Sequence, residues 1–146
     1  MTGEPDLSTA PRPRVLVAED DADMRALVAD ILRKEGLDVE ELANGQRLLV
    51  RVVEAFGSGR EGDAGIDLIV SDVRMPFCSG LDVLEEVHRS RCRTPVLLMT
   101  AFGERDLSSR VQALGGRLLD KPFTPLALRT AVRELLGKSV RVPFVP

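Results

Sequence analysis

The sequence predicts an α/β fold in which helices cover both faces of a parallel sheet. Short apolar runs alternate with segments whose apolar residues recur every three to four positions, and this pair repeats five times between residues 14 and 137. Parallel strands need a crossover connection, which a helix after each strand supplies. A chain of 146 residues with 44% hydrophobic and 29% charged residues has the size and composition of one globular domain.

The first two strand–helix units occupy the amino-terminal part of the chain. The strand RVLVA (14–18) is followed by a helix with five residues on its predicted apolar stripe: Met24, Leu27, Val28, Ile31 and Leu32. Gly36 is expected to end this helix. The weak strand GLDVEEL (36–42) leads into a second helix, whose apolar residues are Leu48, Leu49, Val52, Val53 and Phe56.

The remaining three units follow a Gly-rich loop at 57–65. The run IDLIVSD (66–72) is apolar enough to predict a central strand that is buried on both faces. The later elements are expected at helix 80–90, strand 95–100, helix 104–114, strand 117–121 and helix 125–136. Thr124 is the candidate cap of the last helix, and Pro125 suits its first turn.

Composition narrows the function classes. A net charge of -3 and a pI near 5.3 give no basic surface for direct binding of nucleic acid or of an anionic membrane. No apolar run reaches the roughly 18 residues that span a bilayer, and residues 1–13 lack an apolar signal core. We therefore expect a cytoplasmic protein, with a disordered tail at 1–13 and a tail or linker at 138–146. Cys78 and Cys92 are expected to be unpaired.

Reactive side chains follow four of the five predicted strands. Glu19 and Asp20 follow the first strand, Asp72 ends the third, Thr100 the fourth and Lys121 the fifth. In parallel α/β sheets, ligands bind beyond the carboxyl ends of the strands. Three carboxylates, a hydroxyl and an ammonium group at one edge suit a divalent cation and a phosphoryl group, since Mg²⁺ prefers oxygen ligands and phosphate prefers cationic and hydroxyl donors.

Each of these residues also has a structural explanation when it is taken alone. Asp20 or Asp21 could cap the first helix, where an acid is favourable. Asp72 could be a turn residue, Thr100 a capping hydroxyl and Lys121 a solvated strand end. These explanations do not account for the convergence of all of them on one edge of the sheet.

Four motifs, in this order, resemble the receiver domains of two-component response regulators: VLVAEDDADMR, DLIVSDVRMPFCSGLDVL, PVLLMTAFG and LLDKPFT. The resemblance covers residues 14–137, which we expect to form one receiver domain. It implies a flavodoxin-like, doubly wound (βα)5 fold with a five-stranded parallel sheet in the order 2-1-3-4-5.

The resemblance implies a phosphorylation and metal site. Asp72 would accept a phosphoryl group from the phosphohistidine of a histidine kinase or phosphotransfer protein, or from a small acyl phosphate. Mg²⁺ or Mn²⁺ would be held by Glu19, Asp20, Asp72 and the backbone carbonyl of Arg74. Glu19 stands where the family more often has Asp. The chain would be a phosphoacceptor signalling domain, with no enzymatic activity beyond its own phosphoryl transfer and slow autodephosphorylation.

The resemblance also implies roles for residues around the phosphoryl group. Thr100 and Lys121 would contact it, and Lys121 would form a cis peptide with Pro122. The family has an aromatic switch residue three positions before the Lys, where this chain has Leu118 and contains no Tyr or Trp at all. Phe102 could cover the site and slow the approach of water. The signal would pass through the face of the fourth helix, fifth strand and fifth helix, which could also form a homodimer.

Other classes fit the sequence less well. GKS (137–139) ends a helix instead of starting one, which argues against a phosphate-binding loop. Arg74 stands where a haloacid dehalogenase phosphatase has its second Asp, and acids after the first strand would repel a flavin phosphate. The main alternative is a receiver-like scaffold that works by protein contact without phosphorylation. Leu118 supports that alternative, and the complete set of strand-end residues opposes it.

Overall fold

The computed structural model of the chain describes residues 11–56, 65–101 and 105–137. Strands and helices alternate throughout, as the sequence predicts: β1 (Arg14–Ala18), α1 (Ala22–Lys34), β2 (Asp38–Leu42), α2 (Gly45–Phe56), β3 (Leu68–Asp72), α3 (Gly80–Arg89), β4 (Val96–Ala101), α4 (Arg105–Ala113), β5 (Arg117–Lys121) and α5 (Pro125–Gly137). Most of the predicted amino-terminal tail and all of the carboxyl-terminal one lie outside the described residues.

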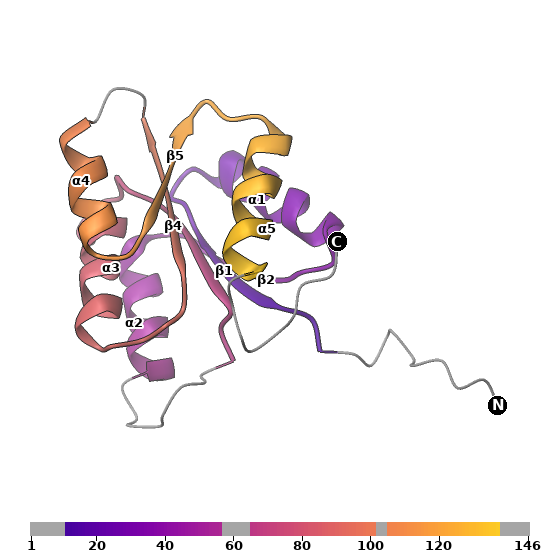
Figure 1. Ribbon diagram of the computed structural model, residues 1–146. Helices are drawn as coiled ribbons and strands as arrows, with labels where there is room; N and C mark the ends of the chain where they lie inside the picture. The colour runs from indigo at the N-terminus through magenta and orange to yellow at the C-terminus, as the bar shows by residue number, and fades with distance from the viewer. Residues whose placement is uncertain (1–10, 57–64, 102–104, 138–146) are drawn as a thin grey trace.

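The five strands form one parallel sheet in the order β2-β1-β3-β4-β5. This order is the one that the family resemblance implies. Helices α1 and α5 cover one face, while α2, α3 and α4 cover the other (Figure 1). The chain passes from β1 outward to β2 and then back across β1 to β3, so the strand order reverses between β1 and β3.

Each face of the sheet has its own apolar core. Val15 and Val17 of β1 pack with residues of α1 and α5, whereas Leu16 of the same strand packs with residues of α2 and α3. The alternation follows from the two-residue repeat of a strand. All five residues of β3 are buried. The prediction of a central strand covered on both faces is therefore confirmed.

The predicted helix ends match local hydrogen bonds. Asp21 caps α1 through its side chain, which accepts from the amides of Asp23 at 2.9 Å and Met24 at 3.1 Å. Gly36 follows α1 with φ of 86°, in the left-handed region that favours glycine. The Thr124 hydroxyl accepts from the Ala127 amide at 3.0 Å, so the predicted cap of α5 is confirmed.

The prediction of the apolar stripes is wrong for two residues. Leu27 of α1 is 49% exposed and Val53 of α2 is 51% exposed. In α1 the buried face includes Ala29, which turns the stripe away from Leu27. In α2 the buried line runs through Leu48 and Val52, and the next residue points about 100° away because a helix has about 3.6 residues per turn.

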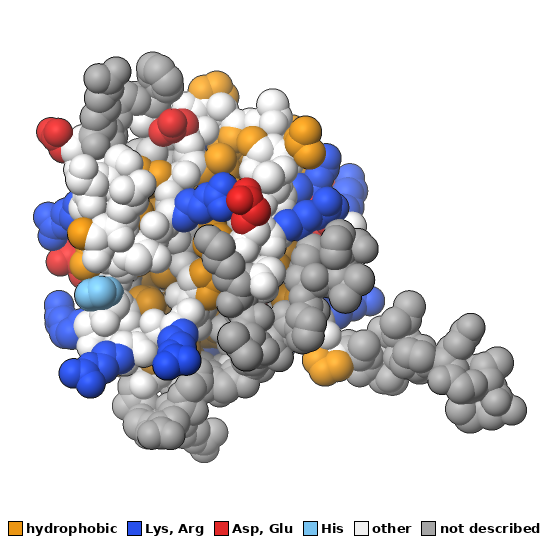
Figure 2. All heavy atoms as spheres, viewed as in Figure 1, with side chains coloured by type: hydrophobic (Ala, Val, Ile, Leu, Met, Phe, Trp, Pro, Cys, Tyr) orange, Lys and Arg blue, Asp and Glu red, His pale blue; other side chains and the backbone are white. Residues whose placement is uncertain are grey.

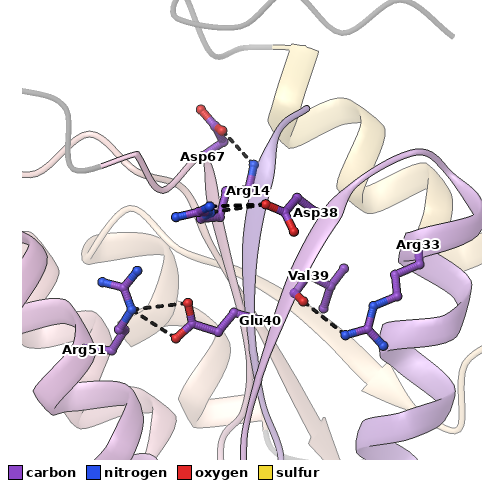
Figure 3. A network of polar contacts seen from close by, with 7 residues as sticks. All are labelled: Arg14, Arg33, Asp38, Val39, Glu40, Arg51 and Asp67. Atoms are coloured by element: carbon purple, nitrogen blue, oxygen red, sulfur yellow. Dashed lines mark hydrogen bonds and ion pairs between the residues drawn. The ribbon is translucent and has the colours of Figure 1, made fainter. Parts of the chain in front are cut away.

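Polar contacts hold the amino-terminal ends of β1, β2 and the segment before β3 together (Figure 3). The Arg14 side chain lies 3.3 Å from Asp38 Oδ2, and the Arg14 amide donates to Asp67 Oδ2 at 2.8 Å. On the edge strand, Arg33 Nη2 donates to the Val39 carbonyl at 3.1 Å. A side chain that bonds an edge carbonyl hinders pairing with a further strand.

Both cysteines are free, as predicted. Burial, followed by the nearby charge of Asp82, raises the pKa of the Cys78 thiol. The protonated form is therefore favoured, which makes Cys78 a poor nucleophile. Over the described part of the chain, no helix combines the length and the apolar character needed to cross a membrane.

Candidate functional site

The carboxyl ends of the strands bring together the side chains that the sequence singles out. Glu19 and Asp20 follow β1, Asp72 is the last residue of β3, Thr100 lies near the end of β4, and Lys121 is the last residue of β5. β1 and β3 are neighbours at the reversal of strand order. The site therefore occupies the position at which open α/β sheets bind ligands.

The backbone of Glu19 is held on two sides. Its amide donates to the carbonyl of Leu42 at 3.2 Å, at the end of β2. Its carbonyl accepts from Arg25 Nη1 of α1 at 2.8 Å. Together with the cap made by Asp21, these bonds fix the short connection from β1 to α1 and leave the Glu19 side chain 2% exposed at the site.

Three carboxylates form a potential cation site. One oxygen from each of Glu19, Asp20 and Asp72 lies within 4.8 Å of the others. Glu19 and Asp72 are buried, whereas Asp20 is exposed. Glu19 Oε2 is buried and has no hydrogen-bond partner among the described residues. A buried oxygen without a partner is costly, and a hard divalent cation bound there would satisfy it. The donor set therefore fits Mg²⁺.

Lys121 bridges two of these carboxylates. Its Nζ lies 3.2 Å from Glu19 Oε1 and 3.3 Å from Asp72 Oδ1. Burial alone would lower the pKa of the Lys121 ammonium, but the charges of Asp72 and Glu19 outweigh burial and raise this pKa. The site therefore holds a fixed positive charge beside Asp72.

The pKa of Glu19 moves in the opposite sense to that of a surface carboxyl in an ion pair. Burial, then the neighbouring Asp72 carboxylate, raise it from 4.5 to about 7, even though Lys121 acts to lower it. Close like charges and desolvation both disfavour the ionised form. Binding of an additional cation would therefore favour the ionised form of Glu19.

Thr100 is 1% exposed and follows Met99, which is in register with Asp72 on the adjacent strand. Its hydroxyl donates to the Ala101 carbonyl at 3.5 Å, the limit of a hydrogen bond. A group held this weakly is available to donate to another acceptor. The peptide between Lys121 and Pro122 is cis.

Two of the other predicted site residues lie within the described part of the chain, and one does not. Arg74 is two residues beyond β3 with an exposed side chain, and the metal-ligand role of its carbonyl stays a prediction. Leu118 is half-buried in β5, in register with Leu98, and packs against the core on the α3 and α4 side. Phe102 lies outside the described residues, so its role as a cover also stays a prediction.

Sequence reasoning missed Gly80, which shapes the backbone beside Asp72. A Cβ atom at Gly80 would collide with the Asp72 carbonyl oxygen. The Gly80 amide also donates to the Val73 carbonyl at 2.9 Å, so α3 begins directly against the end of β3. The signal was present as a glycine after Ser79, which caps α3 in a capping box with Asp82.

The fold and the site define a class: doubly wound α/β proteins that gather acids, a hydroxyl and a lysine at the carboxyl edge of a parallel sheet. Residues 15–133 match the family described as response regulator receiver domain. The chain belongs to this family. Such domains act in two-component signalling as partners of histidine kinases or phosphotransfer proteins, they generally bind Mg²⁺ at an acidic pocket, and they are signalling domains rather than classical enzymes.

Two characterised relatives are transcriptional regulatory proteins. The chain is 35% identical over 140 residues to PdtaR of Mycobacterium tuberculosis. The aligned region covers 94% of this chain and 64% of PdtaR. It is 35% identical over 130 residues to FixJ of Azorhizobium caulinodans, and this alignment covers 86% of this chain and 56% of FixJ. The chain thus spans less than two thirds of the length of these relatives.

A solved structure agrees on the fold. The signal receiver domain of a putative LuxO repressor protein from Vibrio parahaemolyticus is 28% identical to this chain and superposes with a TM-score of 0.75. The match covers 87% of this chain and 92% of that structure. The similarity covers most of the chain and is not limited to the site.

Proposed function

We propose that the chain is a phosphoacceptor that takes a phosphoryl group onto Asp72, with Mg²⁺, from a histidine kinase or a phosphotransfer protein. The observation that carries this proposal is the placement of Asp72: a buried carboxylate 3.3 Å from the Lys121 ammonium and within 4.8 Å of oxygens from Glu19 and Asp20. No other described group of His, Cys, Asp and Glu side chains has the proximity needed to hold a metal ion.

The reaction is a transfer between two nucleophiles. An Asp72 carboxylate oxygen forms a bond to phosphorus while the bond from phosphorus to the donor nitrogen, or to an acyl phosphate oxygen, breaks. The bonding electron pair leaves with the donor, and the product is an aspartyl phosphate. Phosphoryl transfer depends mainly on positioning and on neutralisation of charge. Lys121 supplies a positive charge on one side of Asp72 and would donate to a phosphoryl oxygen.

The metal would be held by the acidic cluster that includes Asp72. Glu19, Asp20 and Asp72 would supply carboxylate oxygens, and the Arg74 carbonyl would complete the protein ligands. When bound, Mg²⁺ or Mn²⁺ neutralises charge on the transferring group. Glu19 is buried and one of its oxygens has no hydrogen-bond partner among the described residues, so this oxygen is available to a metal ion.

Signal output is proposed to use the face of α4, β5 and α5, which could also support a homodimer. Thr100 would donate to the new phosphoryl group and thereby pull on the segment that leads to α4. Leu118 cannot reproduce the hydrogen bond or the large swing of an aromatic switch. Its part in signalling would be limited to repacking against the α3 and α4 side of the core, where it already lies.

One observation favours a second candidate, a receiver-like scaffold that acts without phosphorylation. Leu118 occupies the position of the usual aromatic switch residue, so the output face lacks one familiar component. The carboxylates, Thr100 and Lys121 are nevertheless all in place at the strand ends. A scaffold would have no need for this set, in which the like charges of Glu19 and Asp72 are buried together.

The test is intact mass spectrometry after incubation with acetyl phosphate and Mg²⁺. We expect the wild type to gain the mass of one phosphoryl group and Asp72→Ala to gain none. Asp120→Ala is the matched control, because Asp120 is an exposed acid on β5, next to Lys121. If folded wild-type protein gains no mass, the scaffold is favoured. If Asp72→Ala is still labelled, the phosphoacceptor is another residue.

A further inference from the structure

A hollow lies at the edge of the sheet opposite the acidic site. It has a volume of about 950 Å³ and is bounded by the carboxyl-terminal ends of α3 and α4 and by the segments that enter β4 and β5. None of the site residues at the carboxyl ends of the strands lines it. Its volume is in the range of pockets that hold small organic ligands.

The rim of this hollow is basic and its floor is apolar. Four arginines line it, Arg89, Arg91, Arg93 and Arg117, together with His88, the only His of the chain. No Asp or Glu is among the described residues of its lining. In Figure 2 the pale blue His lies among blue side chains, with orange apolar atoms between them. The floor includes Leu84, Val96 and Leu114.

The arginines of the rim make few and weak interactions with other described side chains. Arg91 and Arg93 form no ion pair or side-chain hydrogen bond within the part of the chain that the structure describes. Arg89 lies 3.4 Å from Glu86 with 74% of its side chain exposed, and Arg117 lies 3.1 Å from a glutamate of α5. Exposed pairs of this kind contribute little free energy, so a ligand can displace them.

The backbone at Arg91 has a conformation that is unfavourable for a residue with a side chain. Helices α1 and α4 end in a turn in which a glycine, Gly36 or Gly115, adopts positive φ and donates to the third residue before it. α3 ends in the same turn, with the Arg91 amide donating to the His88 carbonyl, but Arg91 has φ of 56°. A side chain with a Cβ is disfavoured there by about 1 kcal/mol.

Helix dipoles explain only part of this charge. Cations are favourable near the carboxyl-terminal ends of α3 and α4, which accounts for Arg89. Arg93 lies four residues beyond α3, and Arg117 is the first residue of β5. Arg117 is paired with a glutamate of α5, whereas Arg93 has no ion pair among the described residues, so its charge beside the apolar hollow is unbalanced.

We propose that this hollow binds a nucleotide. Guanidinium groups match phosphate oxygens in a bidentate geometry and also stack on planar rings. Several arginines on one rim suit the multiple charges of a polyphosphate. The apolar floor suits the base, which the chain cannot clamp between Tyr or Trp side chains because it has none. This site is independent of the phosphoacceptor proposed above.

The test is an NMR titration of ¹⁵N-labelled protein with ATP in EDTA, so that Mg²⁺ cannot carry the nucleotide to the acidic site. We expect amide shifts concentrated in residues 87–95 and 114–117. Adenosine alone and inorganic phosphate alone are expected to bind about tenfold more weakly, because each retains only one half of the recognition.

Variants distinguish a specific nucleotide-binding site from general attraction between opposite charges. Arg91→Gly is expected to weaken ATP binding about tenfold, while its melting temperature stays equal or rises, because glycine relieves the positive φ. Arg93→Gln should also weaken binding. Arg47→Gln is the matched control, since Arg47 is an exposed arginine on α2 away from the hollow, and it should leave ATP affinity unchanged. Absent shifts, or equal losses in the control and both test variants, would overturn the proposal.

Discussion

Burial changes the charge state of Glu19. The side chain is 2% exposed and its pKa is raised from 4.5 to about 7. Because the pKa of Glu19 is higher in the folded protein, the folded state binds this proton more tightly than the unfolded chain does. The contribution of this proton to stability is complete below about pH 4.5 and is lost as the pH rises through about 7.

A pH dependence of stability follows for Glu19. In EDTA, the free energy of unfolding of the wild type should fall relative to that of Glu19→Gln between pH 5 and pH 8. Glutamine keeps the shape and cannot ionise, so the difference between the two curves isolates this group. Urea denaturation at several pH values measures it. Parallel curves for the two proteins would contradict the assignment.

At the residue scale, the sequence predicted which groups lie at the strand ends but not how they interact. Glu19, Asp72 and Lys121 could be located because strands end in recognisable places. The contact of Lys121 with Glu19 joins residues 102 positions apart, and the unpaired oxygen of Glu19 depends on how neighbouring strands are packed. These are three-dimensional properties that no local pattern encodes.

Helix α1 connects local capping to the geometry of the site. Asp21 accepts two backbone amide hydrogen bonds and ends the short segment that begins at Glu19. Of the acids that follow β1, Asp20 therefore belongs to the cation cluster, while Asp21 belongs to the helix. The sequence offered helix capping as an explanation for Asp20 or Asp21, and in the structure the cap is Asp21.

Removal of this cap should destabilise the protein. Asp21→Ala is expected to lower the free energy of unfolding by about 1 kcal/mol, because two amides at the start of α1 lose their acceptor. Asp23→Ala is the matched control: it removes an acid from the same turn and should cost only about 0.5 kcal/mol through the helix dipole. Thermal and urea unfolding measure both. Equal losses would show that charge, and not capping, is what Asp21 supplies.

At the element scale, the existence of each strand and helix was predictable, and the face that each helix buries was less so. Leu27 and Val53 are apolar and near the stripe, yet both are about half exposed. The helical repeat gives a broad apolar sector, and the neighbouring helices decide which part of it is covered. Those neighbours are known only from the folded structure.

For the whole molecule, the regular alternation was enough to predict a parallel α/β sheet. It was not enough to order the strands, because several orders obey the same connection rules. The order β2-β1-β3-β4-β5 came from resemblance to a family and agrees with the structure. The position of the site then followed, since the reversal of strand order lies between β1 and β3.

Binding of Mg²⁺ should stabilise the whole domain. A ligand that binds only the folded state adds about 2.7 kcal/mol when it is present at about 100 times its Kd. The melting temperature of the wild type should therefore rise with Mg²⁺ concentration in differential scanning fluorimetry. Asp20→Asn should abolish most of the rise, while Asp120→Asn, an exposed acid outside the cluster, should keep it. A rise of the same size in Asp20→Asn would place the metal elsewhere.

The ion pairs of Lys121 join the last strand of the sheet to the first and the third. On the ribosome the acids after β1 emerge early, and the lysine emerges only when synthesis has passed β5. Until then Glu19 and Asp72 lack the ammonium group that contacts both of them in the folded domain. A nascent chain therefore cannot present the complete site, and phosphorylation competence would report that the domain has been finished as well as folded.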